Sequence, residues 1–193
     1  MCDEQILVVK REHIFNIYEW QGLNNKDTEH YKNIILHNAE FRPRSMMEED
    51  HQFKQIIPYM IFEHKQHYFL MQRKSNASEK RLQNKFSLGI GGHIRQDDMA
   101  GKTIFDWARR EFEEEVVYKD SYDIEVVGVL NDDSNSVGLV HLGLVLVLHG
   151  TSCNIFIRDE HTMGIMASAE DIDAHFDVLE SWSQIVWTKI KSI

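Results

Sequence analysis

The stretch that decides the fold is REFEEEVVY, residues 110–118, in which four carboxylates fall within five positions. Apolar residues recur through this stretch, and through the residues before it, at the spacing of one helix face. At about 100° per residue, these apolar residues form a single stripe. Its members are Phe105, Ala108, Phe112 and Val116. The spacing predicts a helix over residues 103–118 that buries this stripe in the core.

Three of the carboxylates, Glu111, Glu114 and Glu115, fall together in an arc beside the apolar stripe, and Glu113 points elsewhere. We call these three residues the glutamate cluster. A solvated helix face is one interpretation, because each like-charge pair on a helix costs only about 0.2–0.5 kcal/mol. The other interpretation is a cation site, because hard divalent cations prefer oxygen ligands. Glycines upstream, at residues 89–92, would let backbone carbonyls approach such a ligand.

The length and composition of the chain limit the possible classes of protein. Its 193 residues fit a single domain over residues 1–193, with residues 1–54 as an N-terminal extension. A formal net charge of −10 argues against broad attraction to nucleic acid or an anionic membrane. Two cysteines without CxxC spacing argue against a disulfide framework and a cysteine-built zinc site. Without a leader or a membrane-length apolar run, we expect a cytoplasmic protein.

The rest of the chain predicts an α+β protein with a mixed, curved sheet between helices. Strands are expected over residues 5–15 (one long strand or a pair), 55–74 (a pair with a turn at 63–66), 86–94, 123–130, 138–150 and 154–159. Besides the glutamate helix, a short helix is expected near residues 29–36 and two more over residues 168–193. Ser168 is the expected N-cap of the first of these two. Residues 75–85 read as a charged loop.

The glycine strand and the glutamate helix together resemble the Nudix box, a glycine followed at fixed spacing by REUxEExGU, where U is a bulky aliphatic residue. Gly92 takes the glycine position, Arg110 the arginine position, and Phe112 and Tyr118 the U positions. The resemblance extends over roughly residues 56–180, and QIIPY, EKRL and GIGGHI further resemble a bacterial subgroup of predicted phosphoesterases. The resemblance implies a Nudix-like α/β/α sandwich.

The box departs from the family pattern in three places. Seventeen residues separate Gly92 from Arg110, where the family has thirteen, so the intervening loop carries a four-residue insertion. Lys102 stands where the family has its first glutamate, although Asp97 or Asp98 could supply a carboxylate from the longer loop. Val117 stands where the family has glycine. Because β-branched residues disfavour positive φ, we expect this helix to end differently.

By resemblance, the glutamate cluster would bind Mg²⁺ or Mn²⁺, with the carbonyl of Gly91 as a further ligand. Arg110 would hold Glu111 through a bidentate ion pair. The implied catalytic residues are Arg110, Glu111 and Glu115, with Glu111 or Glu115 as the general base. The implied reaction is hydrolysis of a diphosphate linkage in a nucleoside diphosphate derivative or a similar small phosphoanhydride, and a homodimer is possible.

Four residues outside the box could contact the substrate: Arg73, Arg81, His93 and Glu160. The two arginines flank the glycine strand, although basic loop residues are more often merely solvated. His93 follows the glycines directly, and Glu160 is a further alternative for the general base. His141, inside an apolar strand, reads instead as a core histidine with satisfied hydrogen bonds.

Two other functions are compatible with a Nudix-like fold. One is a nucleotide-sensing module that binds without cleaving, although the full set of box glutamates and Arg110 favours an enzyme. The other is isomerisation of an allylic diphosphate, which needs a well-placed cysteine. Neither Cys2 nor Cys153 lies near the box. The metal-dependent hydrolase is therefore the leading hypothesis.

Overall fold

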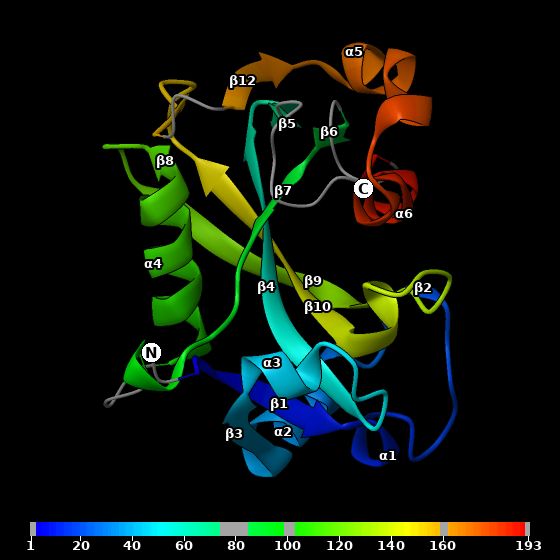
Figure 1. Ribbon diagram of the computed structural model, residues 1–193. Coiled ribbons are helices and arrows are strands. Elements are labelled where there is room, and N and C mark those ends of the chain that lie inside the picture. The colour runs from blue at the N-terminus through cyan, green and yellow to red at the C-terminus, as the bar shows by residue number, and fades with distance from the viewer. Residues whose placement is uncertain (1–2, 74–84, 99–102, 159–161, 192–193) are drawn as a thin grey trace. The chain divides into compact units, whose positions relative to one another are not determined.

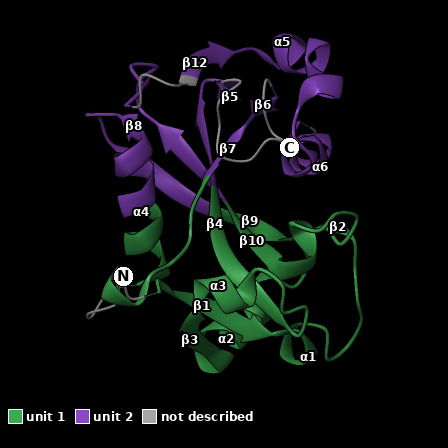
Figure 2. Ribbon diagram, viewed as in Figure 1, with its two compact units in different colours: residues 1–59, 91–108, 126–145 green, residues 60–90, 109–125, 146–193 purple. Residues whose placement is uncertain are grey.

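The computed structural model describes residues 3–73, 85–98, 103–158 and 162–191 (Figure 1). Its contacts divide the chain into two compact units (Figure 2). Unit 1 comprises residues 1–59, 91–108 and 126–145, and unit 2 comprises residues 60–90, 109–125 and 146–193. The long elements β4 (Phe53–His64), α4 (Ile104–Glu115), β9 (Tyr122–Asn131) and β10 (His141–Gly150) contribute residues to both units.

Unit 1 is organised around β1, which pairs antiparallel with β3 on one side and with β4 on the other. Val8 is opposite Glu40 in β3 and Gln55 in β4. β10 lies between β4 and β9 in the sheet, and β9 pairs antiparallel with β2 on its other side. The remaining elements of this unit are β1 (Gln5–Lys10), α1 (Arg11–Ile14), β2 (Gly22–Asn24), α2 (Thr28–Asn38), β3 (Ala39–Pro43), α3 (Arg44–Met47), η2 (Gln96–Asp98) and η3 (Gly138–Val140).

The N-terminal residues form more regular structure than the sequence indicated. The strand predicted over residues 5–15 stops at Lys10, and the chain turns at once into α1. The short helix predicted near residues 29–36 is confirmed as α2. Ile6 and Val8 are fully buried and pack with Met47 and Phe53. Residues 1–54 therefore supply three complete strands and part of the core of unit 1.

Unit 2 contains the predicted hairpin of β4 and β5, in which His64 is opposite His67. Lys65 and Gln66 form its turn with φ of 49° and 62°, the left-handed values that a tight two-residue hairpin loop requires. β12 pairs antiparallel with β5 along its whole length, and β8 pairs with β11 in a separate two-stranded sheet. The elements are β5 (His67–Arg73), β6 (Phe86–Ser87), β7 (Gly89–Gly91, which ends in unit 1), β8 (Val116–Val117), β11 (Phe156–Ile157), β12 (Thr162–Ala167), α5 (Ala169–Ala174), η4 (Phe176–Val178) and α6 (Ser181–Ile190).

The two C-terminal helices are confirmed. Ser168 caps α5 and forms a reciprocal capping box with Asp171. Trp187 of α6 is fully buried, packs edge-on against Tyr68 at 5.1 Å, and donates its indole N–H to Asp173. The predicted α+β class is confirmed, because helices occur between the strands of a many-stranded sheet along the chain.

Candidate active site

The glutamate helix is α4, which begins at Ile104 and ends at Glu115. Ahead of it, the Thr103 hydroxyl and backbone N–H both donate to Asp106 Oδ2, at 2.9 and 2.8 Å. Ala108, Phe112 and Val116 are buried as predicted, whereas Phe105 is only half-buried and Trp107 is buried beside them. The predicted buried face of the helix is thus confirmed for Ala108, Phe112 and Val116, and Phe105 is the exception.

Phe112 fixes the rotation of α4 in unit 2. Its ring stacks on Phe62 with 6.0 Å between centroids and lies edge-on to Tyr122 at 5.3 Å. Phe112 is 1% exposed, and the neighbouring Glu111 is 9% exposed. One carboxylate of the glutamate cluster therefore lies at the boundary of the core, while Glu114 and Glu115 lie on the exposed side of the helix.

Arg110 links two members of the glutamate cluster. Its Nη2 donates to Glu111 Oε1 at 2.5 Å, and its Nη1 donates to Glu114 Oε1 at 2.6 Å. The expected bidentate pair with Glu111 alone is therefore replaced by a guanidinium shared between two carboxylates. The reason is helical spacing, since Glu114 is one turn beyond Arg110 and within its reach. The Arg110 guanidinium thus offsets part of the repulsion in the cluster.

The end of α4 differs from a glycine turn, as the valine at position 117 led us to expect. Val116 and Val117 enter β8 immediately and pair with Ile157 and Phe156 of β11. The carbonyl of Glu115, the last helical residue, accepts the backbone N–H of Arg158 at 2.9 Å. The helix ends three residues earlier than predicted because these valines are in a β ladder.

The chemistry of the glutamate cluster fits a hard cation, because Mg²⁺ and Mn²⁺ prefer carboxylate oxygens. One oxygen from each of Glu111 and Glu114 meets the same guanidinium, so these two carboxylates converge. Among the described residues, however, no three acidic, histidine or cysteine side chains converge closely enough to hold a metal ion. The metal and catalytic roles of Arg110 and the cluster stay predictions.

Gly91 belongs to unit 1, where β7 pairs with β4. A Cβ at this position would lie 3.1 Å from Ile57 Cγ2 and 3.2 Å from the carbonyl oxygen of Pro58. A side chain at this position would therefore require β4 to shift by a few tenths of an ångström. The predicted role of Gly91 as a metal ligand is a separate matter and stays a prediction.

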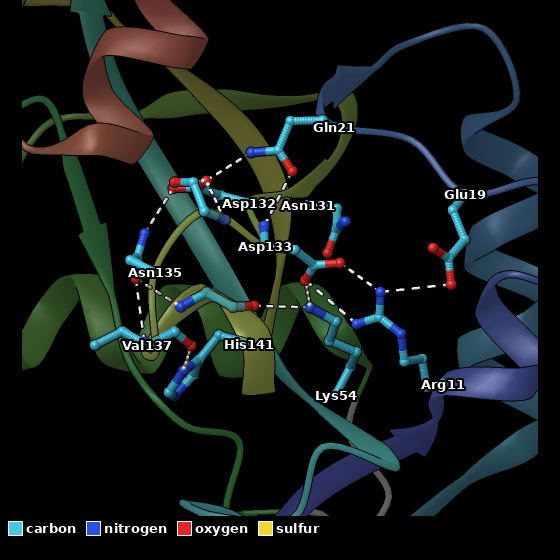
Figure 3. A network of polar contacts seen from close by, with 12 residues as sticks. Arg11, Glu19, Gln21, Lys54, Asn131, Asp132, Asp133, Asn135, Val137 and His141 are labelled. Atoms are coloured by element: carbon cyan, nitrogen blue, oxygen red, sulfur yellow. Dashed lines mark hydrogen bonds and ion pairs between the residues drawn. The ribbon is translucent and has the colours of Figure 1, made fainter.

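Unit 1 contains a buried ion network that sequence reasoning missed (Figure 3). The side chain of Lys54 is fully buried, and its Nζ donates to Asp133 Oδ1 at 2.6 Å and to the carbonyl of Gly138 at 2.7 Å. Arg11 binds both oxygens of Asp133. Burial would raise the pKa of Asp133, but the hydrogen bonds from Arg11 and Lys54 outweigh it and hold the pKa at about 2. Burial lowers the pKa of Lys54 despite its carboxylate partner.

The loop that carries Asp133 is also organised by the preceding carboxylate (Figure 3). Asp132 is 1% exposed and accepts hydrogen bonds from Gln21 Nε2 at 2.7 Å, from Ser134 Oγ at 2.6 Å and from Asn135 Nδ2 at 3.0 Å. A Cβ on Gly138 would lie 1.6 Å from the carbonyl oxygen of Asp132, so only glycine fits there. These contacts show that the polar side chains and the glycine of this loop hold its own structure in place.

His93 and His141 lie side by side in unit 1. His141 Nδ1 donates to the carbonyl of Val137 at 2.6 Å, which confirms His141 as a satisfied core histidine. Its Nε2 is 3.3 Å from His93 Nε2, which is also 2.7 Å from Gln55 Oε1. Burial and the nearby Arg44 lower the pKa of His93 to about 3. His93 is therefore a neutral member of a buried network, and its predicted contact with substrate stays a prediction.

The other predicted substrate residues are only partly covered by the structure. Arg73 is in β5, where its backbone is opposite Thr162. Arg81 and Glu160 lie outside the described residues, as does Lys102. Cys153 is an exposed free cysteine. In the part of the chain that the structure describes, no helix is long and apolar enough to cross a membrane.

Comparison with known proteins agrees with this architecture. No protein-family model matches the chain. Among solved structures, Tm1382, a candidate Nudix hydrolase, matches with a TM-score of 0.84 and 28% identity over 98% of this chain and 99% of that one. A MutT protein from Methanosarcina mazei Go1 matches with a TM-score of 0.53 and 17% identity over 72% of this chain and 94% of that one. The Nudix domain of Shewanella oneidensis NrtR, solved with ADP ribose, matches with a TM-score of 0.57 and 14% identity over 72% of this chain and 87% of that one.

The fold and the glutamate helix therefore define a Nudix protein, and the chain belongs to the Nudix hydrolase superfamily. Within it, the chain is a relative of protein YmaB of Bacillus subtilis (strain 168), at 33% identity over 197 residues, which cover 95% of this chain and 96% of YmaB. Tm1382 and YmaB match nearly the whole chain, whereas the MutT and NrtR structures match 72% of it.

Proposed function

We propose that the chain is a divalent-metal-dependent hydrolase that cleaves the diphosphate linkage of a nucleoside diphosphate derivative or a similar phosphoanhydride. The observation that carries this proposal is the arginine shared between Glu111 and Glu114 on a helix anchored by Phe112. Such an arrangement keeps ionised carboxylates together at one edge of the helix. A cluster of this kind suits a dication that meets a polyanionic substrate.

The roles of the residues follow from their positions. Glu111, Glu114 and Glu115 would hold Mg²⁺ or Mn²⁺, and a bound ion of this kind supplies a Lewis acid that neutralises diphosphate charge. Arg110 orients Glu111 and Glu114, since it binds one oxygen of each. Glu111 or Glu115 would accept the proton of the attacking water, because a carboxylate can act as a general base once it is positioned.

A binding module without catalysis is the alternative. The NrtR neighbour holds ADP ribose in its Nudix domain, and at 14% identity this likeness shows the fold alone. The complete arginine and glutamate set favours catalysis in this chain, because binding alone would not require three box carboxylates.

A Mg²⁺-supplemented screen tests the proposal. It should include ADP-ribose, nucleoside triphosphates and non-nucleotide diphosphates. Cleavage is measured as inorganic phosphate that a coupling phosphatase releases from the products. Glu115→Gln keeps the shape and deletes one anionic oxygen, so it should abolish turnover, while Glu113→Gln on the same helix should retain it. Binding of ADP-ribose without turnover by the wild type would favour the sensing module instead.

Metal-induced stabilisation gives a second readout that needs no substrate. An ion that binds only the folded state stabilises it by about 2.7 kcal/mol at a concentration of 100 times its Kd. Glu115→Gln should lose most of this shift and be level or slightly more stable without metal, because one repelling charge is gone. Glu114→Gln also loses its half-exposed pair with Arg110, so its metal-free stability should gain less. No metal-dependent shift in the wild type would make the cluster a solvated face.

A further inference from the structure

The last turn of α4 carries Glu114 and Glu115, and it ends in an unusual way. Helix ends fray because their last four carbonyls lack partners within the helix, and a glycine at the C-terminus often supplies the closing turn. This chain has Val116 and Val117 there, and both are in an extended strand. Some other element must therefore hold the end of the helix.

That element is β11, which is far from the helix in the sequence. Phe156 pairs with Val117, and Ile157 pairs with Val116. One residue further on, the backbone N–H of Arg158 donates to the carbonyl oxygen of Glu115 at 2.9 Å. A carbonyl at the end of the helix thus receives its hydrogen bond from the residue that follows β11.

β11, which holds the end of the helix, itself packs against β12. A Cβ on Gly164 would lie 2.8 Å from Ile157 Cγ1 and 2.3 Å from Phe69 Cζ. Gly164 is opposite Met71 of β5, inside a fully paired ladder. The glycine therefore leaves the space that Ile157 fills, and β11 is located by the sheet of unit 2.

We propose that β11, together with Arg158, is a positioning element for the glutamate cluster. It holds the backbone at Glu115, and through the last helical turn it sets the direction of the Glu114 and Glu115 side chains. This inference rests on the proposed function, because it assigns the segment to the same site. Arg158 acts through its backbone N–H and does not need to touch substrate.

The physical reason is the tolerance of a metal site. Groups that support the ligands of a metal typically alter affinity or activity by about 10- to 100-fold when they are removed. Glu114 and Glu115 are both exposed, so packing of their own side chains does little to fix them. Arg110 holds the Glu114 side chain, and the hydrogen bond from the Arg158 amide restrains the backbone at Glu115, where the helix ends.

A matched pair of substitutions tests this role. Arg158→Pro deletes the donated N–H, because proline has none, while Arg158→Ala keeps it and removes only the side chain. Mn²⁺ binding measured by electron paramagnetic resonance should weaken about 10-fold or more in the proline variant and stay within about twofold in the alanine variant. Turnover of any diphosphate that the wild type cleaves should fall in parallel, through kcat and with KM for substrate nearly unchanged.

The outcomes separate this inference from the proposed function. If the wild type binds no Mn²⁺ and cleaves nothing, the proposed function fails. If the wild type is active and Arg158→Pro is equally active, or if Arg158→Ala is as impaired as Arg158→Pro, the positioning role is overturned. Should the proline variant not fold, Gly164→Ala keeps every donor but displaces Ile157, and it should weaken Mn²⁺ binding by a few-fold. In the wild type the Arg158 amide should be protected from hydrogen exchange, and exchange at the rate of an unstructured residue would also overturn the inference.

Discussion

Replacing Arg110 by lysine tests the glutamate cluster most directly, because it keeps the positive charge and changes only the geometry. The guanidinium uses two different nitrogens, one for Glu111 at 2.5 Å and one for Glu114 at 2.6 Å. Lysine carries a single ammonium on a flexible stem and cannot reproduce a planar, two-nitrogen fork. Arg110→Lys should therefore keep one of the two contacts at most.

The size of the effect follows from the exposure of the partners. The Glu111 side chain is 12% exposed and that of Glu114 is 53% exposed, so the contact with Glu111 contributes more. Losing one charge-assisted hydrogen bond at a largely buried partner costs about 1.5–3 kcal/mol. If all of this is expressed in the transition state, kcat falls roughly 10- to 150-fold. Losing the contact with Glu114 alone should cost less than about 1 kcal/mol of stability, because that carboxylate is half-exposed.

The assay compares Arg110→Lys with Arg109→Lys, the neighbouring position on the same helix. The Arg109 guanidinium lies over the Tyr122 ring at 5.2 Å from its centroid. Lysine can occupy the same place, and we expect a change within about 0.5 kcal/mol. Turnover and Mn²⁺ affinity are measured for both variants, with urea unfolding to separate damage to the site from damage to the fold.

One result would refute the reasoning. If Arg110→Lys turns over substrate and binds Mn²⁺ within twofold of Arg109→Lys, the shared guanidinium does not orient the cluster. Equal loss in both variants would show that any lysine on this helix disturbs the fold, and the role assigned to Arg110 would again be unsupported.

Three further predictions concern ionic contacts away from the cluster. Lys54→Met should lower the free energy of unfolding, measured by urea titration, by about 2–4 kcal/mol. This loss is smaller than that for breaking an isolated buried ion pair, because Asp133 keeps its contact with Arg11. The control Lys26→Met, at an exposed position, should change the free energy of unfolding little. Since the pKa of Asp133 is lowered to about 2, its contribution of about 2–3 kcal/mol is present above about pH 4 and is lost as the pH falls toward 2, and Asp133→Asn should flatten this acid limb. Burial opposes protonation of His149, but the hydrogen bonds that its ring donates to Glu63 and Glu125 raise its pKa. Its contribution to stability is therefore present below about pH 6.5 and is lost at higher pH. Urea midpoints from pH 5.5 to 8.5 should lose this slope in His149→Gln.

Local patterns predicted the elements whose causes are local. The periodicity around Phe112 gave the buried face of α4, and Ser168 gave the start of α5. The polar residues between two apolar runs gave the turn at Lys65 and Gln66. In each case the deciding contacts lie within a few residues of one another, so a reading of the sequence could find them.

Contacts between distant residues decided what the sequence did not reveal. Lys54 is in a strand that is otherwise largely apolar, which signals a buried lysine, but its partners Asp133 and Arg11 become visible only in the folded chain. The end of α4 was misplaced for the same reason. Val116 and Val117 are too few to show a strand period, and they form a strand only because β11 pairs with them.

The arginine in the cluster also explains how the chain tolerates its gathered charge before any cation binds. With Arg110 shared between Glu111 and Glu114, the repulsion between these two carboxylates is already partly offset, so the helix can form without metal. Glu115 has no part in those two contacts and is anchored instead through its backbone to Arg158. A cation would therefore add to a helix that is already folded, and its binding would not be needed to drive folding. On this reasoning the glycine of the Nudix box is one way to end the helix, and pairing of Val116 and Val117 with β11 is another that can hold the same carboxylates.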